Sequence, residues 1–107
     1  MELAKIIEIM RTPEKIIEPG QCNIISSYVG GFISHYEEQL NEENYQVSVK
    51  WGELRKELKT NSEADRAIEM TEIYRQREKT KLLIGQLKRF RGDLRDRFAV
   101  ITSLKRY

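Results

Sequence analysis

The sequence predicts an all-α protein built as a long helical hairpin, in which two long antiparallel helices follow short N-terminal helices. Three observations lead to this prediction. Both prolines of the 107-residue chain lie before residue 20, so no proline interrupts the remainder. Apolar residues recur at helical spacing over most of the chain. The one stretch with strand-like alternation, residues 45–49, is short and flanked by helical pattern.

The N-terminal part, residues 1–20, is expected to form short helical elements that pack onto something larger. Apolar residues from Leu3 to Met10 recur three and four positions apart, which is the spacing of an amphipathic helix. The pair Thr12-Pro13 then supplies a helix N-cap followed by a proline at the first helical position. Glu18-Pro19-Gly20 is expected to stop this second element.

Two long helices complete the single predicted domain, residues 1–107. An apolar stripe from Ile25 to Leu58 predicts the first over residues 21–59. Ser62 is a good N-cap, and the periodicity that follows it predicts a second helix over residues 62–106. A helix so long and polar needs a partner, which favours a hairpin. Because charged residues make up 34% of the chain, as in coiled coils, we also expect a homo-oligomer.

The pair Gly30-Gly31 is unusual inside the first predicted helix. Each glycine in a helix costs about 1 kcal/mol relative to alanine. A close helix crossing or a kink is one interpretation of the pair, and a hinge or a ligand contact is the other.

The net formal charge of +2 hides a strong asymmetry along the chain. Residues 1–74 carry 8 Lys/Arg and 14 Asp/Glu, a net of −6, whereas residues 75–107 carry 11 and 3, a net of +8. Such asymmetry is typical of a polyanion-binding segment. The predicted nucleic-acid-binding residues of the second helix are Arg75, Arg77, Lys79, Lys81, Lys88, Arg89, Arg91, Arg95 and Arg97.

Aromatic residues are interleaved with these cations and could stack on nucleic-acid bases. Phe98 lies on the apolar stripe, which favours core packing, whereas Phe90 and Tyr107 stay open to either role. A second interpretation of the charge is that the basic half pairs with carboxylates of the first helix, such as Glu37 and Glu42. That pairing is compatible with a DNA site made from the cations left over.

The residues needed for most catalytic sites are missing. His35 is the only histidine and Cys22 the only cysteine, which excludes multi-histidine metal sites and an intrachain disulfide. No glycine-rich phosphate loop occurs. We therefore expect no catalytic residue, metal or cofactor, and hence not an enzyme. Without an apolar run long enough for a membrane span, or a signal peptide, we expect a soluble cytoplasmic protein.

The last third of the chain resembles the C-terminal helix of the UvsY family of phage recombination mediators. The likeness is carried by Ser62–Ile68, Tyr74, Leu83, Leu87 and Arg95–Ile101. In addition, Val49-Lys50-Trp51 with Leu54 resembles the basic–aromatic patch near the end of that family's first long helix. The resemblance covers about residues 24–104.

The resemblance implies a non-enzymatic protein that forms ring-like homo-oligomers, binds single-stranded DNA and helps to load a recombinase in the bacterial host cytoplasm. The family's DNA-contacting patch would fall on Lys50, Arg55 and Lys56. The chain departs from the family in being shorter, which puts the ring geometry in question. Its C-terminal helix is also more basic, which shifts part of the expected DNA surface onto residues 75–97.

The leading hypothesis is a non-enzymatic accessory protein of a phage that binds single-stranded DNA or another polyanion in recombination or replication, with a recombinase or host protein as a further partner. The alternative is a small phage or mobile-element protein that inhibits or adapts a host complex through its helical surface. A third reading is a structural coiled-coil component whose charges are matched internally.

Overall fold

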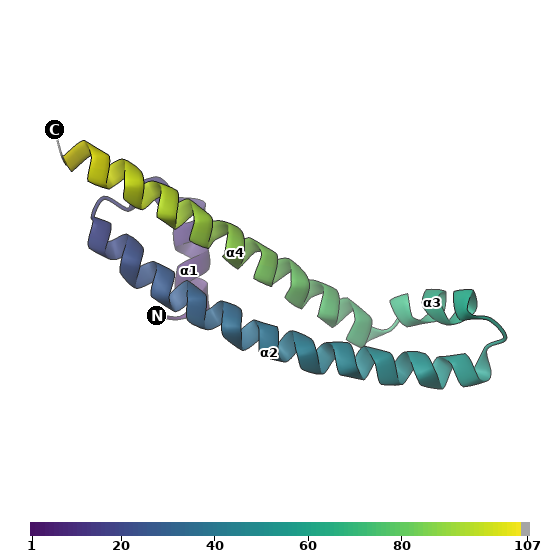
Figure 1. The fold of residues 1–107 in the computed structure, drawn as a ribbon. Helices are drawn as coiled ribbons and strands as arrows, with labels where there is room; N and C mark the ends of the chain where they lie inside the picture. Colours follow the sequence, from purple (N-terminus) through teal and green to yellow (C-terminus); the bar gives the residue numbers. More distant parts are fainter. Residues whose placement is uncertain (106–107) are drawn as a thin grey trace. The chain divides into compact units, whose positions relative to one another are not determined.

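The computed structural model of the protein describes residues 1–105 and confirms the all-α prediction. Helix accounts for 89% of the described residues, and no strand forms among them. The elements are α1 (Leu3–Arg11), the 3-10 helix η1 (Pro13–Lys15), α2 (Pro19–Glu57), α3 (Asn61–Glu69) and α4 (Glu72–Lys105) (Figure 1). Arg106, which ends the predicted second helix, lies outside the described residues, as does Tyr107. None of the described helices is long and apolar enough to cross a membrane.

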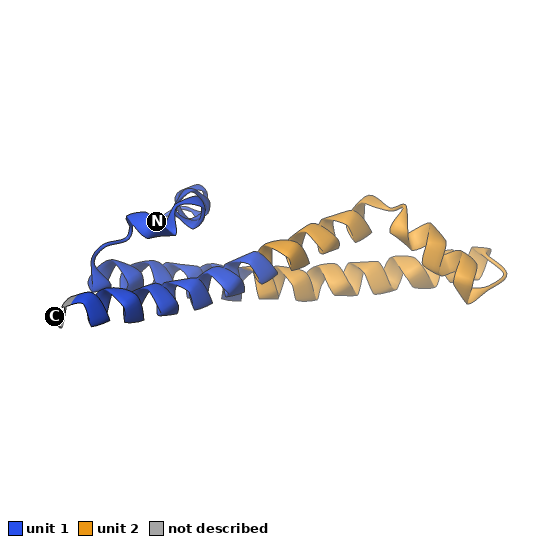
Figure 2. Ribbon diagram, turned by 90° about the horizontal axis from the view of Figure 1, so that it is seen from above, with its two compact units in different colours: residues 1–35, 85–107 blue, residues 36–84 orange. Residues whose placement is uncertain are grey.

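The chain forms two compact units, and both long helices contribute to each. Unit 1 comprises residues 1–35 and 85–107, and unit 2 comprises residues 36–84 (Figure 2). In each unit a segment of α2 lies antiparallel to a segment of α4, which is the predicted pairing of a helical hairpin. In unit 2 the register is marked by Gln39, whose Nε2 donates to Thr80 Oγ1 at 3.3 Å.

Unit 1 is closed by an apolar core. The buried positions on α2 and α4 recur three, four or seven residues apart, so they form one continuous stripe on each helix. Ile6 of α1 and Ile16, after η1, are also buried. The core residues of the two long helices are Cys22, Ile25, Val29 and Ile33 of α2 with Leu87, Phe90, Leu94 and Ile101 of α4.

Unit 2 has a smaller apolar core and a partly polar contact between α2 and α4. Its buried apolar residues are Val47, Ala64, Ile68 and Ile84. Glu43 and Thr80 are buried as well, and Glu43 Oε1 has no hydrogen-bond partner. The short helix α3 is tied to α2 by Trp51, whose Nε1–H donates to Asp65 Oδ1 at 2.8 Å. Polar groups therefore carry part of the packing in this unit.

The prediction of one continuous helix over residues 62–106 was wrong. Helix α3 ends at Glu69, and α4 begins at Glu72. Thr71 explains the break, because its Oγ1 accepts from the Tyr74 N–H at 3.3 Å while donating to the Ile68 carbonyl at 2.6 Å. A threonine that bonds the neighbouring backbone in this way competes with the helical hydrogen bonds and caps a new helix.

Two predicted helix starts also shift. The N-cap of α3 is Thr60 and not Ser62, because Thr60 Oγ1 accepts from the Glu63 N–H at 3.2 Å. Pro19 opens α2 and does not end the preceding element, in keeping with the preference of proline for the first helical turn. There Gln21 Oε1 accepts from the Glu18 N–H at 3.2 Å and satisfies a backbone donor at the helix start.

No close helix crossing occurs at Gly30-Gly31 within residues 1–105. Helix α2 continues unbroken through both glycines. A Cβ atom added at either position would meet nothing within 4 Å, so no neighbouring helix within the protein needs the space. The glycines also have no positive φ that would require them. Packing among the described residues therefore does not require glycine at either position.

Candidate nucleic-acid interface

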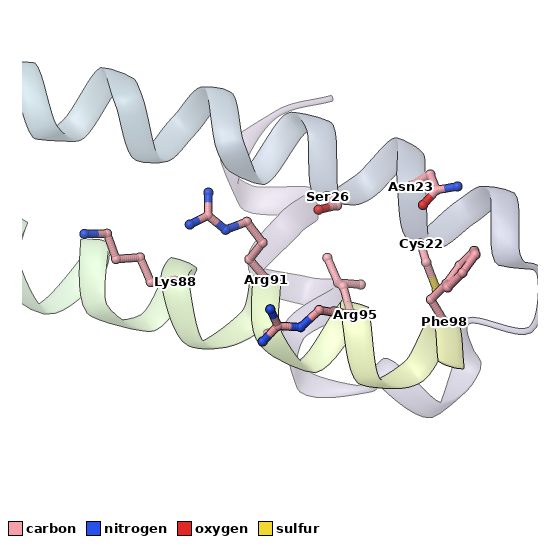
Figure 3. A pocket seen from close by; sticks show the side chains of 9 residues that line it. Cys22, Asn23, Ser26, Lys88, Arg91, Arg95 and Phe98 are labelled. Atoms are coloured by element: carbon pink, nitrogen blue, oxygen red, sulfur yellow. The ribbon is translucent and has the colours of Figure 1, made fainter. Parts of the chain in front are cut away.

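A basic groove lies between α2 and α4 in unit 1 (Figure 3). Its volume is about 460 Å³, and three cationic side chains of α4, Lys88, Arg91 and Arg95, line it. Asn23 and Ser26 contribute polar groups from α2. The remaining lining residues are Cys22, Gly92, Leu94 and Phe98. No carboxylate is among them, so the groove has a single sign of charge.

The sequence positions these side chains by a simple offset from the core. Each groove cation directly follows a buried residue: Leu87, Phe90 and Leu94 precede Lys88, Arg91 and Arg95. On α2, Asn23 and Ser26 likewise follow Cys22 and Ile25. One residue turns an α-helix by about 100°. The groove residues therefore flank the apolar stripes, where the two helices separate.

The cations of the groove are only partly neutralised within the protein. Arg91 and Arg95 are exposed, and neither has an ion-pair partner among residues 1–105. Unit 1 carries 10 Lys/Arg and 6 Asp/Glu, a net of +4, whereas unit 2 carries 9 and 11, a net of −2. Like charges held around one hollow repel one another, and an anion bound between them relieves that repulsion.

Cys22 lines the groove but is not suited to nucleophilic chemistry. Burial raises the pKa of its thiol, and the nearby positive charge of Arg97 offsets this rise only in part. A thiol with a raised pKa stays protonated at neutral pH, whereas the thiolate is the reactive form. Cys22 therefore belongs to the core of unit 1.

Arg97, a predicted DNA contact, holds the N-terminal segment onto α4. Its Nε donates to the Ile16 carbonyl at 2.9 Å, and its Nη2 donates to the Glu14 carbonyl at 3.1 Å. Hydrogen bonds from a charged donor are stronger than neutral ones. The guanidinium is thereby committed to the fold of unit 1.

The unit 2 cations of α4 do not converge on a hollow. Arg77 lies over the Tyr74 ring, 4.7 Å from its centroid, and its Nη2 pairs with Glu78 Oε1 at 3.0 Å. Lys81 Nζ lies 3.6 Å from the same oxygen. These cations pair with a carboxylate on α4 itself, in contrast to the expected pairing with α2. Arg75 and Lys79 of unit 2 are exposed and lie outside the groove, as does the exposed Arg89 of unit 1.

The cations expected from the family resemblance are mostly engaged locally. Lys50 Nζ lies 3.6 Å from Glu53 Oε2 on the same helix. Arg55 donates from Nε to Asn61 Oδ1 at 2.6 Å and from Nη1 to the Leu58 carbonyl at 2.8 Å, which secures the turn after α2. Lys56 is exposed and has no ion-pair partner among the described residues.

The aromatic side chains offer little to a nucleic-acid base inside the groove. Phe90 is 2% exposed, so of the two roles left open for it the structure shows core packing and not stacking on bases. Phe98 is half-buried and lines one end of the groove (Figure 3). Tyr107 lies outside the described residues. The geometry therefore favours contacts to phosphate over stacking at this site.

Comparison of the chain with protein-family models, with curated proteins and with solved structures finds no match. Among residues 1–105, no three His, Cys, Asp or Glu side chains come together in a way that could hold a metal ion. The basic groove is therefore the candidate functional site of the protein.

Proposed function

We propose that the protein binds nucleic acid, with the phosphate backbone of a single strand lying in the basic groove. One observation carries the proposal: Lys88, Arg91 and Arg95 line a hollow that contains no carboxylate. Cations that neutralise phosphates release condensed counterions, and this release drives sequence-independent binding. The hydroxyl of Ser26 and the amide of Asn23 can add hydrogen bonds to phosphate oxygens.

The dimensions of the groove favour a single strand over a duplex. Lys88 to Arg95 covers roughly 10 Å of α4 at 1.5 Å per residue, which suits a few consecutive phosphates. Packed helices lie about 8–10 Å apart, so the hollow between them is narrow compared with a duplex, whose major groove alone is about 12 Å wide. A flexible strand can enter such a hollow.

The biological setting is a further part of the proposal. A role in phage recombination, with delivery of a recombinase to DNA, is supported by the family resemblance alone and stays a prediction. Self-association would place several grooves on one strand and multiply weak contacts through effective concentration. One chain offers only three groove cations, and each phosphate contact is weak at physiological salt. Several linked grooves would therefore bind a strand more tightly than one.

Fluorescence anisotropy with labelled oligonucleotides tests the proposal. The double variant Arg91→Gln/Arg95→Gln removes two groove cations, and Arg75→Gln/Lys79→Gln removes two exposed cations of α4 outside the groove. We expect the groove variant to bind single-stranded DNA much more weakly than the control. A plot of the log of the association constant against log salt has a negative slope, and in the groove variant this slope should be shallower by about 1.4. Each phosphate contact on a single strand contributes about 0.7 to its magnitude.

The outcomes separate the competing explanations. Equal losses in the two double variants would contradict the groove as the site. Absence of wild-type binding to single-stranded DNA and RNA at about 20 mM salt would overturn the nucleic-acid proposal, since electrostatic binding is strongest there. Recovery of one host protein without nucleic acid, in a pulldown that the groove variant abolishes, would instead support the host-inhibitor hypothesis.

A further inference from the structure

The first half of α2 contains an uncharged segment that stands out in this chain. The 18 residues from Pro19 to Tyr36 contain no Asp, Glu, Lys or Arg, although such residues make up 34% of the whole sequence. The next longest run without these residues, 98–104, has seven. A surface helix of a single-chain protein normally carries charge on its solvent side.

One side of this segment faces solvent. Ile24 is 58% exposed and Tyr28 44% exposed, and Ser27, Gly31 and His35 are also exposed. We call these five residues the uncharged face. At about 100° per residue these five positions fall within an arc of about 100°, so they share a side of the helix. A hollow of about 380 Å³ is lined by Ser27, Tyr28, Gly31, Phe32 and His35.

Gly31 gains nothing from the packing within the chain. A Cβ atom there would meet nothing within 4 Å, and its φ is not positive. A helix that approached from outside, however, could come closest where Ser27 and Gly31 present little side-chain bulk. The exposed side chains of Ile24 and Tyr28 would then be covered on either side of the contact.

We propose that the uncharged face packs against the same face of a second copy of the protein, with two α2 helices crossing about a twofold axis. The choice of a second copy rests on charge. A partner helix that carried charges would have to bury them without a counter-charge, which is costly. The only long uncharged helix that the chain itself offers is residues 19–36, and a twofold contact brings that same surface to both sides.

The basic groove stays open in such a dimer. Asn23 and Ser26, which line the groove, fall on a different side of α2 from Ile24 and Tyr28 at about 100° per residue. The inference specifies the self-association named in the proposed function, but it needs no nucleic acid. It can therefore be tested, and can fail, independently of polyanion binding.

The size of the face predicts a weak dimer. A helix of 18 residues is about 27 Å long, and one side of it offers on the order of 300 Å². Stable interfaces usually bury about 800 Å² per partner. We therefore expect association in the range of about 10–100 µM and not a permanent dimer.

Sedimentation equilibrium without oligonucleotide, between about 5 and 500 µM protein, tests the dimer. The mean mass should rise from the 12.7 kDa of one chain toward twice that value. Gly31→Lys should weaken association at least about tenfold, because two lysines would be buried face to face. Gly85→Lys is the matched control: it adds the same charge at an exposed α4 glycine with equally open space, and it should associate like wild type.

A second variant keeps the test independent of an added charge. Gly31→Ala should raise the melting temperature measured at low concentration, because alanine favours helix and meets no atom within the chain. The same methyl group should weaken association, because it would stand in the contact. A protein that remains a monomer throughout the concentration range would overturn the proposal. So would a dimer that survives both substitutions at Gly31.

A separate variant distinguishes failure of the dimer proposal from failure of the nucleic-acid proposal. Arg91→Gln/Arg95→Gln leaves the uncharged face intact and should associate like wild type. If this variant still forms the dimer but does not bind oligonucleotides, both proposals are supported. If it loses the dimer while Gly31→Lys retains it, the contact lies at the groove and the uncharged face is the wrong surface.

Discussion

Unit 1 and unit 2 use the same two helices but hold them together differently. In unit 1 the facing stripes are apolar, from Val29 on α2 to Leu87 on α4, both 0% exposed. In unit 2 the contact includes the buried side chains of Glu43 and Thr80. Glu43 Oε1 and Arg77 Nε lack hydrogen-bond partners there. One hairpin therefore combines a core that stabilises by burial with a contact that bears a desolvation cost.

The difference follows the chemistry of the surfaces. Where the core is fully apolar, cations are displaced to its flank, and Lys88, Arg91 and Arg95 meet at a groove. Where the core is partly polar, Arg77 has a buried Nε, and its Nη2 pairs with Glu78 Oε1 on the same helix.

The largest effect should come from truncating the apolar core of unit 1. Leu87→Ala is expected to lower the free energy of unfolding by about 3 kcal/mol, because a fully buried leucine leaves a cavity. Glu43→Ala, at a buried position of unit 2, should cost less than about 1 kcal/mol, because its Oε1 has no hydrogen bond to lose. Urea unfolding followed by circular dichroism measures both, and similar losses would erase the contrast between the units.

An intermediate loss of stability is expected on replacing Arg97 or Arg55, which donate hydrogen bonds to the segments that connect the helices. Arg97→Ala should cost about 2 kcal/mol, because it removes two hydrogen bonds that join α4 to the segment near η1. Arg55→Ala should cost about 1 kcal/mol, because it secures only the local turn after α2. Thermal unfolding of the two variants checks the order. A larger loss at Arg55 would mean that the turn of unit 2, and not the N-terminal segment, limits stability.

A gain in stability, and not a loss, is expected at glycines inside α2. Gly30→Ala in unit 1 and Gly52→Ala in unit 2 both place a Cβ in open space, so each should stabilise the helix by about 1 kcal/mol. If the units unfold together, the two variants should raise one common melting temperature equally. If the units unfold independently, each substitution should slow hydrogen exchange only at the amides of its own unit.

The sequence was sufficient for the existence of the helices because their apolar periodicity is long. It was weaker at the boundaries, where a single side chain decides. Thr71 breaks the second predicted helix through two hydrogen bonds, and Thr60 takes the capping role from Ser62. Threonine before glutamate at positions 71 and 72 is a start signal that outweighed the continuing apolar pattern.

The candidate site was predicted in part. Charge asymmetry pointed to α4, but it could not divide the cations between the groove, the local ion pairs and the contacts of Arg97. The polar residues Asn23 and Ser26 were missed, although their positions directly after buried residues carried a signal. Which cations converge depends on the register of α2 against α4, and that register is a property of the packed pair.

Trp51 in unit 2 and Cys22 in unit 1 each occur once in the chain, and these two residues can act as natural reporters. Trp51, bonded to Asp65 in unit 2, is the only tryptophan, so its fluorescence would change when α3 leaves α2. Cys22 is the only cysteine, and its buried thiol can react with a labelling reagent only when unit 1 opens. Tryptophan emission would therefore report the opening of unit 2, and the thiol-labelling rate would report the opening of unit 1, both on the unaltered protein.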